Sequence, residues 1–243
     1  MNFNYKSFEK NYFKILYLLI FVSVFFLSCG LYVVFYYSPD DYLQANLVKI
    51  LYLHVPSAWL SIMFYLFLGT FSLLFIIFKS PIFDIIAKSF GISSVYLTLA
   101  TLITGSIWGK PAWGTWWIWD ARLTSMLILL CFEIIYFMLR NTFNNKERSA
   151  KIASIFAIFG LIDLPIIKFS VDLWATLHQK STFLLLSAPK IHISMIYPLG
   201  LMFFAIFFLA LSVTFINIRL EIVNRKVRYV FIGKKSMVSS DNN

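Results

Sequence analysis

The sequence predicts an all-α integral membrane protein with six transmembrane helices and both termini in the cytoplasm, or in the matrix of an organelle. Of its 243 residues, 60% are hydrophobic and 13% are charged. The mean hydropathy of +0.80 lies outside the range of ordinary soluble domains. One transmembrane helix needs about 20 mostly apolar residues, so the length leaves room for about six spans with short loops. A large water-soluble catalytic domain is therefore excluded.

Six apolar runs are the expected spans of a single membrane domain. The first follows three lysines and continues too far, without a small-residue cleavage site, for a secretory signal, so we expect an uncleaved helix. The fifth is short and contains Asp163 and Pro165, which predicts a kink and a partly hydrated wall. The expected spans are residues 15–37, 50–78, 89–109, 123–139, 152–167 and 191–218, followed by a basic tail at 219–243.

The distribution of lysine and arginine gives the expected orientation. With six spans, fifteen of these residues fall on the side of the two termini and six fall on the other side. Cytoplasmic loops carry the excess of positive charge, so both termini are expected inside. The loop at 108–122, His54 near the end of the second span and His178 in the fifth loop are then expected together on the outer face.

Several function classes are excluded by what the sequence contains. Most basic residues lie between apolar runs, so the formal net charge of +10 indicates membrane topology rather than nucleic-acid binding. Cys29 and Cys131 each lie inside an apolar run and are far apart, which predicts no disulfide, zinc site or covalent haem-attachment motif. The sequence has no Gly-x-x-x-x-Gly-Lys loop, so any energy from ATP must come from another protein.

The most unusual stretch runs from Trp108 to Thr124 and reads WGKPAWGTWWIWDARLT. It places five of the seven tryptophans of the chain within twelve residues. Two glycines and a proline interrupt any long regular helix there, so we expect an irregular aromatic loop at 108–122 between two apolar runs. Such a loop offers large apolar planes to a flat ligand.

The residues expected on the outer face match the needs of a porphyrin, a flat apolar disc with a central metal and carboxylates at one edge. Such a ligand needs apolar planes, one or two axial imidazoles and cations near the carboxylates. His54 and His178 are the candidate axial ligands, and Arg122 or Lys110 is the candidate partner of the carboxylates. The candidate planes are Trp108, Trp113, Trp116, Trp117 and Trp119.

Each of these residues also has a simpler interpretation. Single tryptophans at a membrane interface are most often belt residues, although five with interspersed glycines and a Trp-Asp pair are harder to explain that way. A histidine near a helix end is usually a satisfied polar residue, and His192 is a third candidate that lacks an aromatic neighbourhood. Arg122 can instead pair with Asp120 or anchor the fourth span. Asp163 and Glu133, inside spans, are candidates for function or for pairing with a neighbouring helix.

These residues resemble a known family. The stretch from Trp108 to Thr124 resembles the tryptophan-rich WWD signature of haem-handling proteins of cytochrome c biogenesis. Residues 51–56 (LYLHVP), and 164–167 (LPII) leading to 174–179 (WATLHQ), are similar to segments of the haem exporter protein C (CcmC) family. The resemblance covers residues 52–182, includes both histidines in order and fits six spans. Larger relatives with the signature have more spans, so the short chain favours this family.

The resemblance implies a haem-binding protein of c-type cytochrome biogenesis. It implies a bacterial inner membrane with the functional loops in the periplasm, or else the mitochondrial inner membrane. Haem b, iron protoporphyrin IX, is implied as a transiently bound cofactor, with His54 and His178 as axial ligands. The segment from Trp108 to Asp120 is implied as the haem platform and the docking surface for a partner.

The same resemblance implies a set of partners. Haem is delivered to the haem chaperone CcmE, to which it becomes covalently attached, and the small protein CcmD and the ATP-binding cassette pair CcmA and CcmB act beside it in the membrane lipid. The chain then assists that attachment and is not expected to be an enzyme in its own right.

Two other function classes stay open. A b-type haem subunit for electron transfer usually buries its histidines in pairs within spans, whereas the candidates here lie at one face. A transporter that moves haem or another solute through the bilayer needs a pathway, for which Asp163 with Pro165 is the only intramembrane feature.

Overall fold

The computed structural model describes residues 5–40, 45–174, 176–178 and 192–240. Throughout these ranges the regular elements are helices, which confirms the predicted all-α fold class. Six helical segments are long and apolar enough to cross a membrane, as predicted. The elements are α1 (Tyr5–Tyr36), a 3-10 helix η1 (Asn46–Ile50), α2 (Leu51–Phe78), α3 (Pro81–Trp113), α4 (Ala121–Thr142), α5 (Lys146–Gly160), α6 (Asp163–Leu173) and α7 (Ile193–Ser240).

The helices extend beyond the apolar runs because an apolar run marks only the part of a helix that lies in hydrocarbon. Helix α3 begins with Pro81 at its first position, where a missing N–H costs nothing. It ends at Trp113, and Gly114 follows with a φ of 77° and donates its N–H to the Lys110 carbonyl at 3.0 Å. The irregular loop expected at 108–122 is therefore shorter, at 114–120, and two of its tryptophans lie on the helix.

The fifth span is a broken helix. Helices α5 and α6 together form one candidate span, Lys146–Asp172, and the helix is interrupted at Leu161 and Ile162. In a continuous helix Pro165 would have no N–H for the Leu161 carbonyl and its ring would clash with that carbonyl. The kink expected at Asp163 and Pro165 is thus present as a break one turn before the proline.

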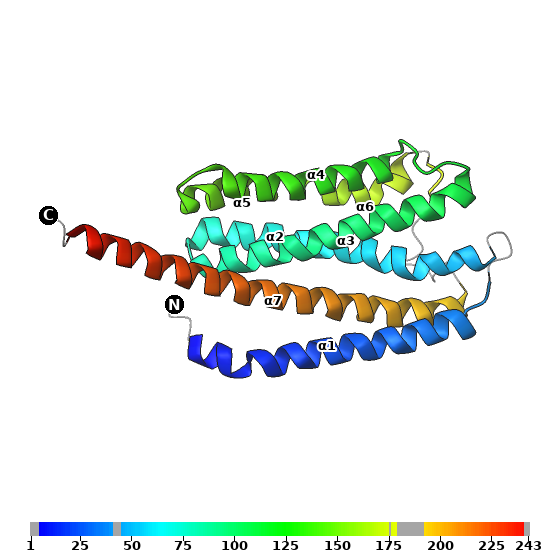
Figure 1. Cartoon of the computed structure of the whole chain (residues 1–243). Helices are drawn as coiled ribbons and strands as arrows, with labels where there is room; N and C mark the ends of the chain where they lie inside the picture. The colour runs from blue at the N-terminus through cyan, green and yellow to red at the C-terminus, as the bar shows by residue number, and fades with distance from the viewer. Residues whose placement is uncertain (1–4, 41–44, 175, 179–191, 241–243) are drawn as a thin grey trace.

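Helices α2 and α3 occupy the middle of the bundle, with α4, α5 and α6 on one side and α7 on the other (Figure 1). Helix α1 packs on the outer side of α7. The first turns of α1 and the last turns of α7 lie at the same end of the molecule. We call the other end, at which α3 ends and α4 begins, the tryptophan end.

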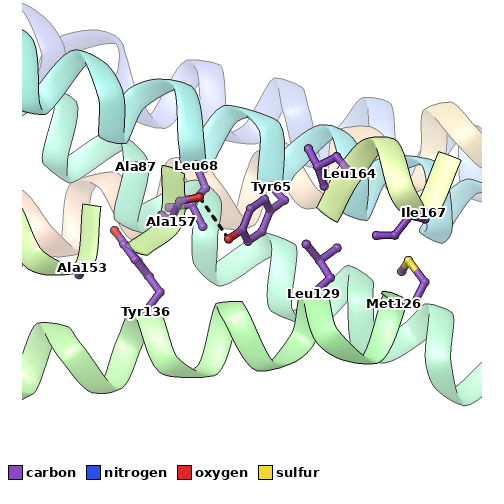
Figure 2. Close-up of a cluster of buried hydrophobic side chains, with 10 residues drawn as sticks. All are labelled: Tyr65, Leu68, Ala87, Met126, Leu129, Tyr136, Ala153, Ala157, Leu164 and Ile167. Atoms are coloured by element: carbon purple, nitrogen blue, oxygen red, sulfur yellow. Dashed lines mark hydrogen bonds between the residues drawn. The ribbon is translucent and has the colours of Figure 1, made fainter. Parts of the chain in front are cut away.

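A buried core holds α4, α5 and α6 against α2 and α3 (Figure 2). The Tyr65 hydroxyl of α2 donates to the Ala157 carbonyl of α5 at 3.3 Å. Alanines on α5 allow a close approach of the helix backbones. Met126 of α4 and Ile167 of α6 belong to this core and also line a cavity above it, so the core fixes the floor of that cavity.

Charged side chains join three helices at the end opposite to the tryptophan end, which we call the ion-pair end. The buried Asp84 of α3 accepts hydrogen bonds from Arg140 of α4 at 2.6 and 3.0 Å, and from Arg225 of α7. Glu221 of α7 accepts from Arg225 at 2.9 Å and from Lys88 of α3 at 2.5 Å. This network fixes α7, which is far away in sequence, against the centre of the bundle.

Candidate functional site

A cavity of about 540 Å³ lies at the tryptophan end, with walls from α2, α3, α4, α6, the loop at 114–120 and the chain at 177–178. Its volume falls in the range of about 300–1,000 Å³ that is typical of small-molecule sites. Most of its lining is aliphatic or aromatic. The polar and charged residues of the lining are His54, Thr101, Ser106, Arg122, Lys168 and His178. Such a cavity suits an apolar ligand that a few polar groups orient.

His54 lies in the first turn of α2, is only 8% exposed and lines the cavity. Its Nδ1 is 3.1 Å from the Thr101 carbonyl and 3.1 Å from the Thr104 hydroxyl. The carbonyl can only accept, and the Thr104 hydroxyl already donates to the Ala100 carbonyl at 2.6 Å. Nδ1 is therefore the protonated nitrogen, and Nε2 carries the lone pair. Histidines that ligate a metal are held in this way by a backbone carbonyl.

His178 reaches the same cavity from the chain that follows α6. Its ring centroid is 6.4 Å from that of His54, with an angle of 40° between the planes. Metal–imidazole bonds are about 2.0 Å long, so two ligating nitrogens lie about 4 Å apart, and the ring centroids lie further apart than that. With one nitrogen of each ring turned toward the other, a separation of this size fits one metal ion between the rings.

Three of the five clustered tryptophans line the cavity: Trp108, Trp113 and Trp117. Trp108 meets His54 edge-on, with ring centroids 5.7 Å apart, and Trp113 lies 6.2 Å from His178. Each histidine thus has an aromatic neighbour that limits how its ring can turn. Of the five tryptophans predicted as aromatic planes, the structure brings these three to the cavity.

The other two tryptophans point away from the cavity. Trp116 is 58% exposed and Trp119 is 76% exposed, and neither lines the cavity. Lys110 lies over the ring of Trp116, with Nζ 5.9 Å from the centroid, and donates to the Gly114 carbonyl at 3.1 Å. Both rings are exposed at the tryptophan end, outside the cavity, and we call Trp116 and Trp119 the exposed aromatic surface.

Two buried donors of the cavity wall have no hydrogen-bond partner among the residues that the structure describes: Nε of Arg122 and Nε1 of Trp117. The other end of the Arg122 guanidinium donates to the Ile167 and Lys168 carbonyls of α6, at 3.4 and 3.3 Å. Of the two cations predicted to meet a ligand carboxylate, Arg122 lines the cavity, whereas Lys110 lies outside it. A buried donor without a partner costs free energy, which a bound acceptor would recover.

Comparison with known proteins now identifies the family. A sequence model described as "Heme exporter protein C" matches residues 3–232. The chain belongs to the heme exporter protein C family. Heme exporter protein C of Bradyrhizobium diazoefficiens is 39% identical over 206 residues, which cover 85% of this chain and 78% of the relative. Heme exporter protein C of Escherichia coli K12 is 35% identical over 197 residues, 81% of this chain and 79% of the relative.

A plant relative is also similar. The putative cytochrome c biosynthesis ccmC-like mitochondrial protein of Marchantia polymorpha is 43% identical over 185 residues, which cover 76% of this chain and 78% of the relative. Relatives from bacteria and mitochondria, together with six candidate spans, show a multi-pass membrane protein with a haem-handling role in cytochrome c biogenesis.

Asp120, predicted at the haem platform of this heme exporter protein C chain, does not line the cavity. It is the N-cap of α4, where one carboxylate oxygen accepts from the Leu123 N–H at 2.8 Å. Its other oxygen accepts from the Thr176 hydroxyl, and that hydroxyl accepts from the His178 N–H at 3.0 Å. Asp120 therefore positions the chain that carries His178, and does so without contact with the cavity.

Sequence reasoning missed three kinds of residue that shape the cavity. Glycines at 105 and 109 lie one turn apart on α3 and leave space for the side chains of His54 and Trp113. A Cβ at 105 would lie 3.0 Å from the His54 ring, and one at 109 would lie 2.9 Å from the Trp113 ring. Their spacing of four along an apolar helix is the signal that was available. Trp59 of α2 and Met126 of α4 also line the cavity, and nothing in the sequence marks them.

The remaining candidates lie away from the cavity. Glu133 is buried on α4 and accepts from Ser94 at 2.5 Å and from Thr98 at 3.0 Å, both on α3, which agrees with pairing to a neighbouring helix. Asp163 begins α6 and is buried outside the cavity lining. His192 is exposed and contacts the Ser194 hydroxyl at 2.8 Å.

Proposed function

We propose that this protein holds haem b in the cavity at the tryptophan end, between His54 and His178, and delivers it to a haem chaperone. The observation that supports this most directly is the arrangement of the two imidazoles. They come from distant parts of the chain, face one apolar cavity and lie 6.4 Å apart. The hydrogen bond that Nδ1 of His54 donates to the Thr101 carbonyl leaves Nε2 available as a metal ligand. An apolar ligand without a metal would need neither feature.

The rest of the lining fits the macrocycle and its two carboxylates. Trp108, Trp113 and Trp117 offer apolar surfaces beside the two histidines. The unpaired donors of Arg122 and Trp117 are suited to the carboxylates at one edge of haem. Bound haem would supply an iron with two axial positions, and the chain supplies the ligands, the apolar walls and these donors.

The orientation of the chain supports a site on the outer face of the membrane. Fifteen of the lysines and arginines belong to the segments on the side of the termini, and six belong to the other side. By the positive-inside rule, the tryptophan end then faces the periplasm, or the intermembrane space in an organelle. The lack of a phosphate-binding loop in the sequence agrees with ATP-binding partners such as CcmA and CcmB, with CcmD in the same membrane assembly.

The exposed aromatic surface is suited to a partner that collects haem. Trp116 and Trp119 expose more than half of their surface beside the cavity, and Trp119 touches the cavity residue Trp117 with ring centroids 5.6 Å apart. Tryptophan is one of the residue types enriched at the energetic hot spots of protein interfaces. We therefore place the docking site of a CcmE-like chaperone on this surface, next to the haem that it receives.

The proposal is tested by the absorption spectrum of the purified full chain titrated with haemin. We expect the low-spin spectrum of two-histidine ligation, which His54→Ala and His178→Ala each abolish. His192→Ala is the matched control, because His192 is the remaining histidine of the chain and lies outside the cavity lining, and it should leave the spectrum unchanged. Unchanged spectra in both cavity variants would overturn the ligand assignment. Mixing the loaded protein with a purified CcmE-like chaperone then measures delivery.

A further inference from the structure

A second cavity lies between α2 and α7, beside the first. It has a volume of about 240 Å³ and is lined by Trp59, Ile196, Leu199, Gly200 and Phe203. This volume is below the range of about 300–1,000 Å³ found for small-molecule sites, so the cavity does not hold a ligand of haem size by itself. All five lining residues are apolar and both helices are candidate membrane spans, so this groove is suited to contact with lipid hydrocarbon.

Trp59 is the residue at which this groove and the haem cavity meet, because it lines both. It lies five residues after His54, about 7.5 Å further along α2 and away from the tryptophan end. Its ring is 6.2 Å from that of Phe203 on α7, at an angle of 58°, and the residue is 38% exposed. The groove therefore adjoins the cavity of the two histidines at this one residue.

Small residues and a proline lie around this groove. A Cβ added at Gly200 would meet no atom within 4 Å, so the α7 side of the groove is open. Ala58, next to Trp59, is small and lines the haem cavity. Pro198 lies inside α7 and cannot donate to the Ser194 carbonyl, which removes one helix hydrogen bond beside the groove. Helix bending is concentrated at such prolines.

Building on the haem-binding function proposed above, we propose that this groove is a lateral entrance. Haem reaches the histidines from the hydrocarbon layer, between α2 and α7, when the Trp59 ring swings aside. Haem dissolved in a bilayer keeps its carboxylates at the interface and its apolar edge among the acyl chains, since burial of an unpaired charge is costly. The groove admits that apolar edge, and the cavity polar groups at the tryptophan end, Arg122 and Lys168, then meet the carboxylates.

The test compares haem uptake from two sources. The full chain in lipid nanodiscs is mixed with phosphatidylcholine vesicles that carry haemin, or with haemin bound to albumin in solution, and the two-histidine spectrum is followed in time. Gly200→Phe fills the groove from the side away from the haem cavity. We expect it to slow uptake from vesicles several-fold, with the same final spectrum and the same uptake from albumin. Trp59→Ala, which removes the ring at which the groove and the cavity meet, should raise the ratio of the vesicle rate to the albumin rate.

Leu209→Phe is the matched control, since Leu209 is an exposed residue of the same helix, more than two turns beyond Gly200, and outside the groove lining. It should leave both rates unchanged. Equal rates from vesicles in the wild type and in Gly200→Phe, or equal slowing from both sources, would overturn the lateral entrance while haem binding itself stands. A wild-type chain without the two-histidine spectrum from either source would instead overturn the proposed function, and the entrance with it.

Discussion

Two sets of buried polar groups, one at each end of the bundle, differ in how they are paired. At the ion-pair end, both carboxylate oxygens of Asp84 accept hydrogen bonds from arginine, and Glu221 is paired with both Lys88 and Arg225. At the tryptophan end, Nε of Arg122 and Nε1 of Trp117 have no partner within the described part of the chain, and both residues line a cavity.

The chain pairs the first set with its own side chains, whereas the second set is open to a ligand. Buried polar groups in native proteins are almost always paired, because an unpaired one costs about 1–3 kcal/mol. The network around Asp84 and Glu221 meets this requirement with side chains of the chain itself, so its role is to hold α3, α4 and α7 together. For Arg122 and Trp117, which lack a partner among the described residues, an acceptor in the cavity would meet it. The first end should govern stability, and the second should govern haem affinity.

The largest effect is expected from Asp84→Ala at the ion-pair end. Removal of this carboxylate leaves the Arg140 side chain, only 9% exposed, without the partner that it contacts at 2.6 Å. Loss of one partner from a buried ion pair costs about 3–5 kcal/mol of stability, since the remaining charge stays buried. Thermal unfolding in detergent should show the loss, whereas the haem affinity of the protein that remains folded should stay near that of the wild type.

Glu147→Gln is the matched control for that variant. Glu147 pairs with Lys151 at 2.8 Å, but its side chain is 69% exposed, so water replaces the lost partner and the unfolding temperature should change little. A similar loss of stability in both variants would show that burial does not determine how much an ion pair contributes to the stability of this protein. A fall in haem affinity as large as the fall in stability would show that the two ends are coupled.

The fold class was predictable because hydrophobicity along the chain is a local property. Each span needs only its own apolar run, and Pro165 and Asp163 marked the break between α5 and α6 in advance. The ion-pair end was not predictable, because Asp84 is separated by 56 residues from Arg140 and by 141 from Arg225. Nothing local in the sequence indicates which of many charges meet when the helices pack.

The sequence indicated the residue types of the candidate site. It did not indicate which of the tryptophans line the cavity and which lie outside it. Rings that are adjacent in sequence face opposite ways: Trp117 enters the cavity, and Trp116 does not. That outcome depends on where α3 ends, and Gly114 in a left-handed conformation sets this end at Trp113. At this end of α3, Lys110 donates to the Gly114 carbonyl and lies outside the cavity. The sequence alone therefore did not indicate whether Lys110 or Arg122 lines the cavity.

A smaller effect is expected from Asp120→Asn at the tryptophan end. An asparagine oxygen still accepts from the Leu123 N–H and caps α4, but its NH₂ group cannot accept from the Thr176 hydroxyl. The chain that carries His178 then loses a hydrogen bond to a charged group. We expect haem affinity to fall by about 1.5 kcal/mol, roughly tenfold, with an unchanged two-histidine spectrum at saturation. Haemin titration measures both quantities.

Thr176→Val removes the same hydrogen bond from its other partner and keeps the shape of the side chain. If Asp120 acts on His178 through Thr176, the double variant should bind haem about as well as Thr176→Val alone, because residues that share one interaction are not additive. Fully additive losses would mean that Asp120 affects haem by another route. Wild-type affinity in Asp120→Asn would mean that the Asp120–Thr176 contact does not position His178 at all.

The smallest effect is expected from Trp117→Phe, which keeps an aromatic plane in the cavity wall and removes only the unpaired N–H. Arg122 is a less clean test, because its guanidinium also donates to two carbonyls of α6. If Nε1 of Trp117 donates to a haem carboxylate, Trp117→Phe should weaken haemin binding by about 0.5–1.5 kcal/mol. The dimethyl ester of haemin, whose carboxylates carry no charge, should lose much less affinity. Trp116→Phe, outside the cavity, should bind both compounds as the wild type does. Equal losses for haemin and its ester would show that Trp117 acts through the packing of its ring, and that its unpaired N–H is not completed by the ligand.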